Sequence, residues 1–398
     1  MMGRPSGALR IIVLGYVIRG PLGGMVWHHL QYLQGLAELG HEVYFLEDSD
    51  DYPSCYNPER GFTDVDPTYG LHFASCVFEP IGFKERWAYH DAHQQRWHGP
   101  RADEMVSLCA EADLLINLAC VNPIRPWVAE IPVRIYLDQD PAFNQVRHLI
   151  DSKARESAGQ HNVFFSFGEN IARGDSLVPS DGFPWMATRQ PVVLSSVPAS
   201  APCKDGKFTT VMQWQSYPAV EYGGHGYGMK SDSFMNFLDL PSRTGPVFNL
   251  AIGGPAPREL LQSKGWSLHD PMEVSRDLWT YETFIRSSKA EFGIAKHGYV
   301  EGRTGWFSER SVFYLATGRP VLAHETGFSS WLKTPGGVLP FRSASEAASA
   351  IAEVDRRYDF HCRSAREVAT EYFDACKVLP DLIERAMNAT PCDICTAG

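Results

Sequence analysis

The sequence predicts an α/β protein with two Rossmann-like, doubly wound domains that face each other across a cleft, followed by C-terminal helices. Apolar strands alternate with amphipathic helices in both halves of the 398-residue chain, and a proline-rich stretch separates the halves. Strands that alternate with helices form parallel sheets with right-handed crossovers. A chain of this length suits two domains of roughly 150–200 residues each.

The first half opens with the apolar run of residues 9–18, a pattern typical of a strand buried on both faces. A glycine- and proline-rich break follows it, and apolar residues then recur at helical spacing over 25–39. Gly40 is the expected left-handed stop of that helix. A helix is also expected near 102–112, with further strands at 41–46, 114–120, 133–137 and 163–167.

Prolines recur through residues 176–207 as in an interdomain linker, after which the alternation restarts. The second half is predicted to contain strands at 208–214, 247–252, 291–295 and 321–323, and helices at 257–264, 274–288 and 308–317. The predicted division is an N-terminal domain over 1–180, a linker over 181–207, a C-terminal domain over 208–370 and a tail over 371–398. We expect the tail to form a helix that packs back on the N-terminal domain.

The overall composition argues against several classes of partner. The 47 acidic residues outnumber the 36 basic ones and give a net charge of −11, so nucleic acid is not expected as a partner. No apolar stretch approaches the roughly 18–20 residues of a membrane-spanning helix, and the N-terminus lacks a signal-peptide cleavage site. The cysteines are scattered, apart from Cys392 and Cys395 near the end, and form no disulfide framework. The chain is therefore expected to be cytoplasmic, and its oligomeric state stays open.

The turn after the first strand indicates which ligand it can hold. It reads GYVIRG over residues 15–20 and lacks the G-x-G-x-x-G pattern of NAD- or FAD-binding turns. Gly23 and Gly24 instead precede the helix, where they allow a ligand to approach free backbone N–H groups at the positive end of the helix dipole. His28 lies one turn into this helix, and its ring is expected to face the cleft.

Two segments resemble those of GT-B glycosyltransferases. In the first, a Gly-Gly loop opens a helix that ends in Gly-His-Glu-Val, and aligning residues 40–43 places Gly23, Gly24 and His28 on the glycine pair and histidine of the motif. In the second, over residues 290–328, a Gly-rich turn opens a donor-binding helix that ends in Gly-x-Pro-Val. The resemblance implies a GT-B glycosyltransferase whose N-terminal domain binds the acceptor and whose C-terminal domain binds a nucleotide-diphosphate sugar.

The second segment contains most of the predicted donor-binding residues. Ser308 can cap the helix, while Gly305 lets the pyrophosphate approach the unpaired N–H groups. Many families of this fold hold the nucleotide ribose with a glutamate, but this sequence has Phe313 at that position. Glu309, one turn earlier on the same face, either takes over this role or complements the helix dipole. The other residues predicted to contact the donor are Trp306, Phe307, Arg303 and His297.

A glycine-rich segment over residues 221–234 is predicted to be a mobile loop. The resemblance places such a loop against the donor. Lys230 would then supply positive charge near the phosphates, and His225 would close over the sugar. The alternative is an ordinary flexible loop with a surface lysine.

His28 is the candidate base of an inverting transferase, because histidine titrates near neutral pH. Asp138 and Asp140 end a predicted strand at the same cleft, and either carboxylate is expected to orient the ring. In a retaining enzyme His28 would instead contact the sugar. The alternatives are a histidine that faces solvent or backbone, and carboxylates that cap a strand end before Pro141. His29 points about 100° away along the helix and is expected to be structural.

Neither a metal nor a cofactor is expected. The 14 histidines include no H-E-x-x-H spacing, and we expect His90, His93 and His98 to lie on a solvated helix. The resemblance implies that a helix dipole and basic side chains, not a divalent ion, stabilise the leaving diphosphate.

These observations together predict a metal-independent glycosyltransferase that moves a sugar from a nucleotide-diphosphate donor to a small-molecule acceptor, as in natural product biosynthesis. A nucleotide-sugar 2-epimerase of the same fold is the first alternative, and it would need no acceptor. A non-catalytic nucleotide- or sugar-binding module is the second alternative, and it would bind its ligand without releasing nucleotide.

Overall fold

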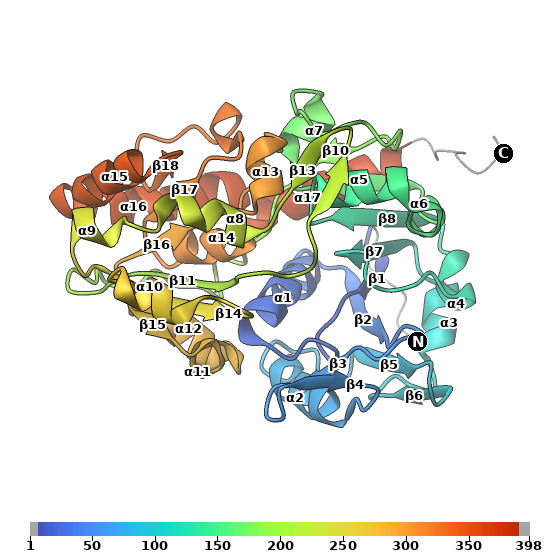
Figure 1. The fold of residues 1–398 in the computed structure, drawn as a ribbon. Helices are drawn as coiled ribbons and strands as arrows, with labels where there is room; N and C mark the ends of the chain where they lie inside the picture. Colours follow the sequence, from blue (N-terminus) through green and yellow to red (C-terminus); the bar gives the residue numbers. More distant parts are fainter. Residues whose placement is uncertain (1–6, 390–398) are drawn as a thin grey trace.

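The computed structural model describes residues 7–389 and contains two large sheets, each flanked by helices (Figure 1). An eight-stranded sheet lies in the N-terminal half and a six-stranded sheet in the C-terminal half, which confirms the predicted fold class. Cys392 and Cys395 lie outside the described residues. Within residues 7–389, no helix is both long enough and apolar enough to span a bilayer.

The N-terminal sheet has the strand order β10-β9-β8-β7-β1-β2-β5-β6, and its strands are parallel except for the antiparallel β5–β6 pair. Ile11 and Val13 of β1 belong to the core under helix α1, whereas Ile12 and Leu14 belong to the core under α3 and α4. The first strand is therefore buried on both faces, as its apolar run predicts. The strands are β1 Arg10–Leu14, β2 Glu42–Asp48, β5 Trp87–Asp91, β6 Arg96–His98, β7 Leu114–Leu118, β8 Val133–Asp138, β9 Val163–Ser166 and β10 Met186–Ala187. The helices are α1 Gly23–Glu38, α2 Thr68–Phe78, α3 Met105–Ala110, α4 Pro126–Ala129, α5 Phe143–Ile150, α6 Ser152–Gly159 and α7 Glu169–Arg173.

Two hairpins in this half differ from the predicted elements. Strands β3 (Cys55–Asn57) and β4 (Phe62–Asp64) form a small separate sheet. The segment that carries His90, His93 and His98 is the β5–β6 hairpin, so the prediction of a solvated helix there is wrong. All five residues of β5 are buried, because the strand pairs with β2 on one side and with β6 on the other.

The C-terminal sheet has the order β15-β14-β11-β16-β17-β18, with every pair parallel. Its strands are β11 Phe208–Gln213, β14 Phe248–Gly253, β15 Leu268–His269, β16 Ala290–Gly293, β17 Val321–His324 and β18 Val338–Phe341. A hairpin of β12 (Val220–Tyr222) and β13 (His225–Tyr227) lies outside it. The helices of this half are α8 Lys230–Phe234, η1 Met235–Phe237, α9 Pro241–Thr244, α10 Arg258–Ser263, α11 Pro271–Ser275, α12 Leu278–Arg286, α13 His297–Glu301, α14 Glu309–Ala316, η2 Phe328–Ser330, α15 Ala344–Arg356, α16 Tyr358–Val368, η3 Ala369–Phe373 and α17 Ala375–Asn388.

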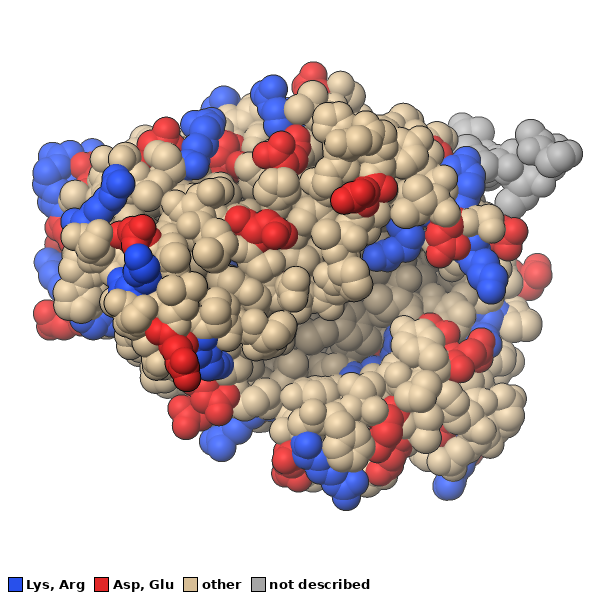
Figure 2. Space-filling view, in the orientation of Figure 1, with Lys and Arg blue, Asp and Glu red and all other residues tan. Residues whose placement is uncertain are grey.

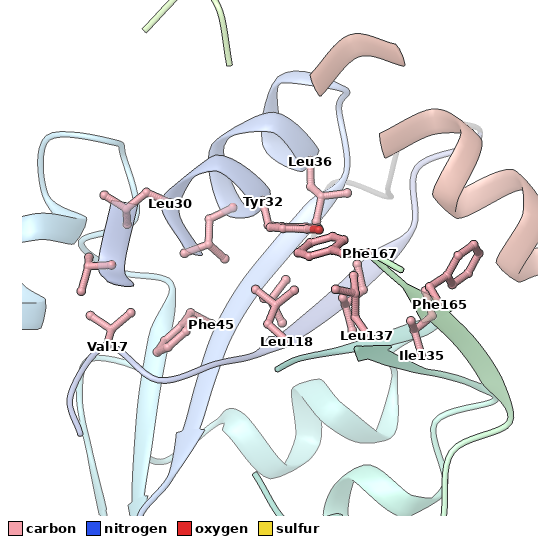
Figure 3. Close-up of a cluster of buried hydrophobic side chains, with 14 of the residues drawn as sticks. Val17, Leu30, Tyr32, Leu36, Phe45, Leu118, Ile135, Leu137, Phe165 and Phe167 are labelled. Carbon is pink, nitrogen blue, oxygen red and sulfur yellow. The ribbon is translucent and has the colours of Figure 1, made fainter. Parts of the chain in front are cut away.

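The largest core of the N-terminal half lies between α1 and the sheet. Figure 3 shows Leu30, Tyr32 and Leu36 of α1 directed at apolar side chains of the strands below. On its other side α1 packs on α17, where a Cβ at Gly35 would come within 2.6 Å of Leu379. The last helix thus returns to the first half of the chain and covers α1.

The proline-rich segment of residues 176–207 is hydrogen-bonded to the N-terminal and C-terminal halves of the chain. Met186 and Ala187 pair with β9 as the edge strand of the first sheet. A few residues later the backbone N–H of Val192 donates to the carbonyl of Phe373 at 2.7 Å. Because the middle of the segment is hydrogen-bonded to both neighbouring elements, it forms an integral part of the junction.

The start of α1 packs directly on the C-terminal half. A Cβ at Gly23 would lie 2.2 Å from the carbonyl oxygen of Asp277, and one at Gly24 would lie 3.0 Å from the ring of Tyr281 in α12. The prediction that these glycines admit a ligand is therefore wrong, because α12 fills their open side. One turn later, Trp27 stacks on Phe313 of α14 with ring centroids 4.1 Å apart.

We predict that Gly23→Ala destabilises the protein, because the added methyl group meets a backbone atom that cannot move alone. Overpacking of this kind costs about 1–3 kcal/mol of unfolding free energy. Thermal and urea unfolding measure the effect. Gly159→Ala is the matched control, since a Cβ there would meet no atom within 4 Å. Equal stability of the two variants would contradict the prediction.

Candidate active site

A small pocket lies where the C-terminal ends of β16 and β17 meet the start of α14. The space between its walls is about 260 Å³ when the open solvent at its mouth is included, and the room for the centres of water molecules is only about 10 Å³. In open α/β sheets ligands bind outside the carboxyl ends of the strands, so this is the expected ligand site of the C-terminal half. The pocket walls include Gly293, Ala295, Trp306, Phe307, Ser308, Arg310 and His324.

The start of α14 has the cap that the sequence predicts. The Ser308 hydroxyl accepts a hydrogen bond from the N–H of Arg310 at 3.2 Å. Gly305, which has φ +76°, does not open toward the pocket: a Cβ there would lie 2.9 Å from Asn170 of α7. The prediction that Gly305 makes room for a pyrophosphate is therefore wrong, because α7 occupies that side. The free N–H groups of the first turn and the capping serine remain at the pocket.

Helix α14 begins with two charged residues, of which Arg310 forms an ion pair and Glu309 does not. The Arg310 guanidinium donates to Glu291 at 2.6 Å and to the carbonyl of Val211 at 2.7 Å. Burial disfavours the charged guanidinium, but the Glu291 carboxylate outweighs it and raises the pKa of Arg310. Glu309 is half-buried and makes no hydrogen bond or ion pair with a described side chain. Phe313, at the position where a ribose-binding glutamate was considered, is fully buried against Trp27.

Lys230 begins helix α8 and interacts electrostatically with Glu309 and Arg310. Burial, followed by the positive charge of Arg310, lowers the pKa of Lys230 to about 7. Among residues 7–389, Lys230 has no hydrogen-bond acceptor and no ion-pair partner within the usual distances. A lysine that is desolvated, close to other charges and unpaired is suited to binding an anionic ligand, because such a ligand would restore its favourable interactions.

The glycine-rich segment before Lys230 forms a β-hairpin in place of the irregular loop that the sequence predicts. His225 pairs with Tyr222 across the β12–β13 hairpin, and its side chain is exposed. Tyr227 packs into the core of the N-terminal half. Gly228 is required by the following turn, because a Cβ there would lie 2.4 Å from the carboxylate of Asp232.

Two of the other predicted donor contacts lie outside the pocket wall. His297 begins α13, and its Nε2 lies 3.8 Å from the Glu301 carboxylate. Arg303 is exposed and has a left-handed backbone with φ 45°. Its carbonyl accepts from the Asn170 side chain at 2.9 Å, so the main-chain contact of Arg303 is with the N-terminal half.

His28 does not form the predicted dyad with an aspartate. Its Nε2 accepts a hydrogen bond from the Gln139 side-chain amide at 2.8 Å, and its ring lies between Tyr32 and Phe167. The side chain is buried, and burial lowers the pKa of His28 to about 3. His28 is therefore neutral near pH 7, and it holds the turn after β8 against α1.

The neighbouring histidine is structural, as expected. His29 donates from Nδ1 to the carbonyl of Met25 at 2.9 Å and accepts at Nε2 from the N–H of Tyr16 at 3.2 Å. These two bonds fasten the turn after β1 to α1. Gly15 is required beside it, because a Cβ there would come within 2.3 Å of the His29 ring.

Asp138 and Asp140 have different surroundings. Asp138 is fully buried and accepts from the side chains of Asn144 at 2.7 Å, Gln145 at 2.9 Å and Ser166 at 2.7 Å. Burial raises the pKa of Asp138, and these donors stabilise the turn after β8. Asp138 therefore fits the alternative prediction, a carboxylate that caps the end of a strand, better than it fits a catalytic role. Asp140 instead reaches across to the C-terminal half, where it accepts from Lys296 at 2.8 Å and from the hydroxyls of Tyr217 and Tyr299.

Several residues at the sheet edges were missed by sequence reasoning. Lys296 and Tyr299 flank the predicted His297, but no pattern in the sequence associates them with Asp140. Asp48, at the end of β2, accepts from His90 at 2.7 Å and from Arg125 at 3.0 Å. Burial favours the neutral acid, but these donors outweigh it and lower the pKa of Asp48.

A search of residues 7–389 finds no group of three or more His, Cys, Asp or Glu side chains arranged to hold a metal ion. His90 is hydrogen-bonded to the Asp48 carboxylate, and it is the cross-strand partner of Trp97 in the β5–β6 hairpin. In the same orientation as Figure 1, the surface is hollowed between the region of α5 and the β3–β4 hairpin (Figure 2). Lysine, arginine and acidic residues are interspersed over the face that this view presents.

The comparisons with known proteins match structures only. Neither known family profiles nor curated proteins match the sequence. An alpha-glucosyltransferase in complex with UDP and a 13-mer DNA matches with a TM-score of 0.56 at 11% identity, over 96% of this chain and 100% of that one. Anabaena HepE in complex with UDP and glucose matches with a TM-score of 0.56 at 10% identity, over the same shares of the two chains.

The chain has the GT-B fold. Both matches extend over the two sheets and the connection between them, and both structures are of glycosyltransferases with bound UDP. The prediction that nucleic acid is not a partner is therefore wrong, and so is the prediction of a small-molecule acceptor that accompanied it. The alpha-glucosyltransferase of this fold is also seen with a DNA that contains an HMU base. A net charge averages over the whole surface, so it carries no information about one groove.

We predict that His28→Gln flattens the pH dependence of stability in mild acid. The pKa of His28 is about 3 in the folded protein, against 6.5 in an unfolded chain, so the unfolded state binds more protons between these values. Stability therefore falls as the pH decreases, and His28 accounts for about 2 kcal/mol of the loss between pH 7 and pH 5. Urea unfolding at a series of pH values measures this loss. Parallel curves for variant and wild type would contradict the assignment of a buried, neutral histidine.

Proposed function

We propose that the protein is a glycosyltransferase that binds a nucleoside-diphosphate sugar at the start of α14 and transfers its glycosyl group to an acceptor hydroxyl. The unpaired Lys230 beside the capped N-terminus of α14 carries this proposal, because the two together form a binding site for a diphosphate. The fold supports it, since ligands of such sheets bind at the same edge. UDP-glucose is the first donor to test, because it is the ligand of a second HepE structure of the same fold.

Different groups around the start of α14 are proposed to stabilise the nucleoside diphosphate as it leaves. Lys230 is suited to neutralise the diphosphate as the glycosidic bond breaks, and the first-turn N–H groups of α14 stabilise its oxygens. Arg310 is held by Glu291, so its charge is fixed in the pocket wall at a defined place. Glu309, the first residue of α14, is half-buried and has no hydrogen-bond or ion-pair partner among the described side chains, so it is assigned to the hydroxyls of the ribose or the sugar.

The positive charge in this arrangement comes from the protein itself, so we propose that transfer needs no divalent metal. The acceptor is expected at the C-terminal edge of the N-terminal sheet. Acceptor assays therefore include duplex DNA with a hydroxymethylated base beside other hydroxyl compounds. Water is included as the acceptor of simple donor hydrolysis.

We predict that UDP binds to the purified protein in the presence of EDTA and that Lys230→Met weakens this binding at least about tenfold, the usual size of a lost charge-assisted hydrogen bond. Isothermal titration measures the affinities for UDP, GDP, ADP and dTDP. Lys264→Met is the matched control, because Lys264 pairs with Asp239 on the exposed surface. No binding of any of these nucleotides by the wild-type protein would overturn the proposed function.

We further predict that UDP binding takes up a proton at pH 8. The pKa of Lys230 is about 7, so at pH 8 about 90% of the free protein carries a neutral Lys230. A bound diphosphate raises this pKa, and the lysine gains a proton. The affinity should therefore decrease as the pH rises above 7. Titrations in buffers of different ionisation enthalpy measure the uptake, and an uptake that persists in Lys230→Met would assign the proton to another group.

A further inference from the structure

Asp140 is the point at which the turn after β8 meets the C-terminal half. Its carboxylate accepts from the Lys296 ammonium at 2.8 Å and from the hydroxyls of Tyr217 and Tyr299. Lys296 also donates to the hydroxyl of Tyr217 at 2.7 Å. The three donors come from segments 77 or more positions further along the chain, so the cluster joins the two halves of the fold.

An aromatic cage surrounds the Lys296 ammonium. Its nitrogen lies 4.4 Å from the ring centre of Tyr217, 4.9 Å from that of Phe143 and 5.4 Å from that of Tyr299. Phe143 begins α5 in the N-terminal half, whereas the two tyrosines belong to the C-terminal half. An ammonium over several ring faces is attracted by each of them, and partial burial strengthens both this attraction and the ion pair.

The two phenols stay protonated and act as donors. Burial, followed by the negative charge of Asp140, raises the pKa of Tyr217 and that of Tyr299 far above the ordinary value. Asp140 is consequently saturated by one ammonium and two hydroxyl donors. Because its oxygens are engaged by these three donors, Asp140 is better suited to position other groups than to contact a substrate.

The cluster is connected to the pocket wall and to the hairpin that precedes Lys230. Tyr299 packs on Trp306, a pocket-wall residue, with ring centroids 4.5 Å apart. Tyr217 precedes the β12–β13 hairpin, which leads to Lys230. On the N-terminal side, Gln139 next to Asp140 is held by His28 of α1. A shift of Asp140 is thereby transmitted to the wall of the pocket.

We propose that Asp140 and Lys296 form an interdomain latch, in which Asp140 is a positioning residue that keeps the pocket at the start of α14 facing the N-terminal half. The effect of the latch on catalysis rests on the proposed function, because it requires that the pocket bind the sugar donor. Holding the two halves together is a property of the fold and is measured without any substrate.

The first test compares Asp140→Asn and Lys296→Met with the double variant Asp140→Asn/Lys296→Met. Small-angle X-ray scattering of the unliganded proteins reports the separation of the halves. Each single variant should show a larger radius of gyration and maximum dimension than the wild type, and the double variant should show no further increase, because either single change already breaks the pair. Asp239→Asn is the matched control, because Asp239 pairs with Lys264 at the same 2.8 Å on the exposed surface.

The second test separates positioning from binding. In Asp140→Asn, the affinity for UDP should stay within about threefold of wild type, while kcat for transfer or donor hydrolysis falls at least about tenfold. A loss of kcat in the double variant no larger than in the single variants would support a pairwise interaction. A merely structural role would lower the thermal stability of all variants and leave kcat per folded molecule unchanged.

Unchanged scattering curves for both single variants would overturn the latch, as would a single variant that keeps the wild-type kcat. Loss of UDP affinity in parallel with kcat would also overturn it, because the cluster would then belong to the nucleotide site. If the wild-type protein binds no nucleotide, the proposed function fails. The scattering result then decides the latch alone.

Discussion

The packing of α1 against α12 is the contact on which the arrangement of the cleft depends. Gly23 leaves no room beside the carbonyl of Asp277, and Trp27 inserts into the C-terminal core against Phe313. The other end of the helix is covered by α17 through the close approach at Gly35. One helix therefore shares its surface with both cores, and the carboxyl edges of the two sheets are held facing each other.

The polar groups on the two sides of the cleft are arranged differently. In the N-terminal half most buried carboxylates are saturated by donors, as with Glu47, which accepts from three consecutive backbone N–H groups in the turn after β1. In the C-terminal half Lys230 and Glu309, near the start of α14, make no hydrogen bond or ion pair with the described side chains. Satisfied groups stabilise turns, whereas an unsatisfied charge in a partly dry site gains most from a ligand. This difference is the reason that the proposed donor site lies on the second sheet.

Sequence reasoning located the strands and the capped helix start well, because a buried parallel strand and a serine cap leave local signals. It was less successful with glycines and histidines. The sequence pattern assigns Gly23, Gly24 and Gly305 to ligand contact, yet another element of the fold packs closely against each of them. His28 was placed in the right helix, but its partner is Gln139, the residue between the two aspartates that were considered. A one-residue difference along an irregular turn changes which side chain faces the helix, and no periodicity predicts it.

By itself the sequence determined the alternation of strands and helices, the break near the middle of the chain and the helix start at Ser308. These features depend on burial patterns and hydrogen bonds that act over a few neighbouring residues. Only the tertiary structure decided that Asp140 pairs with Lys296, 156 positions away, and that Lys230 has no such partner among the described residues. Pairings over such distances depend on how two separately formed sheets dock. That docking is set by the shapes of helices α1, α12 and α17, which no local pattern contains.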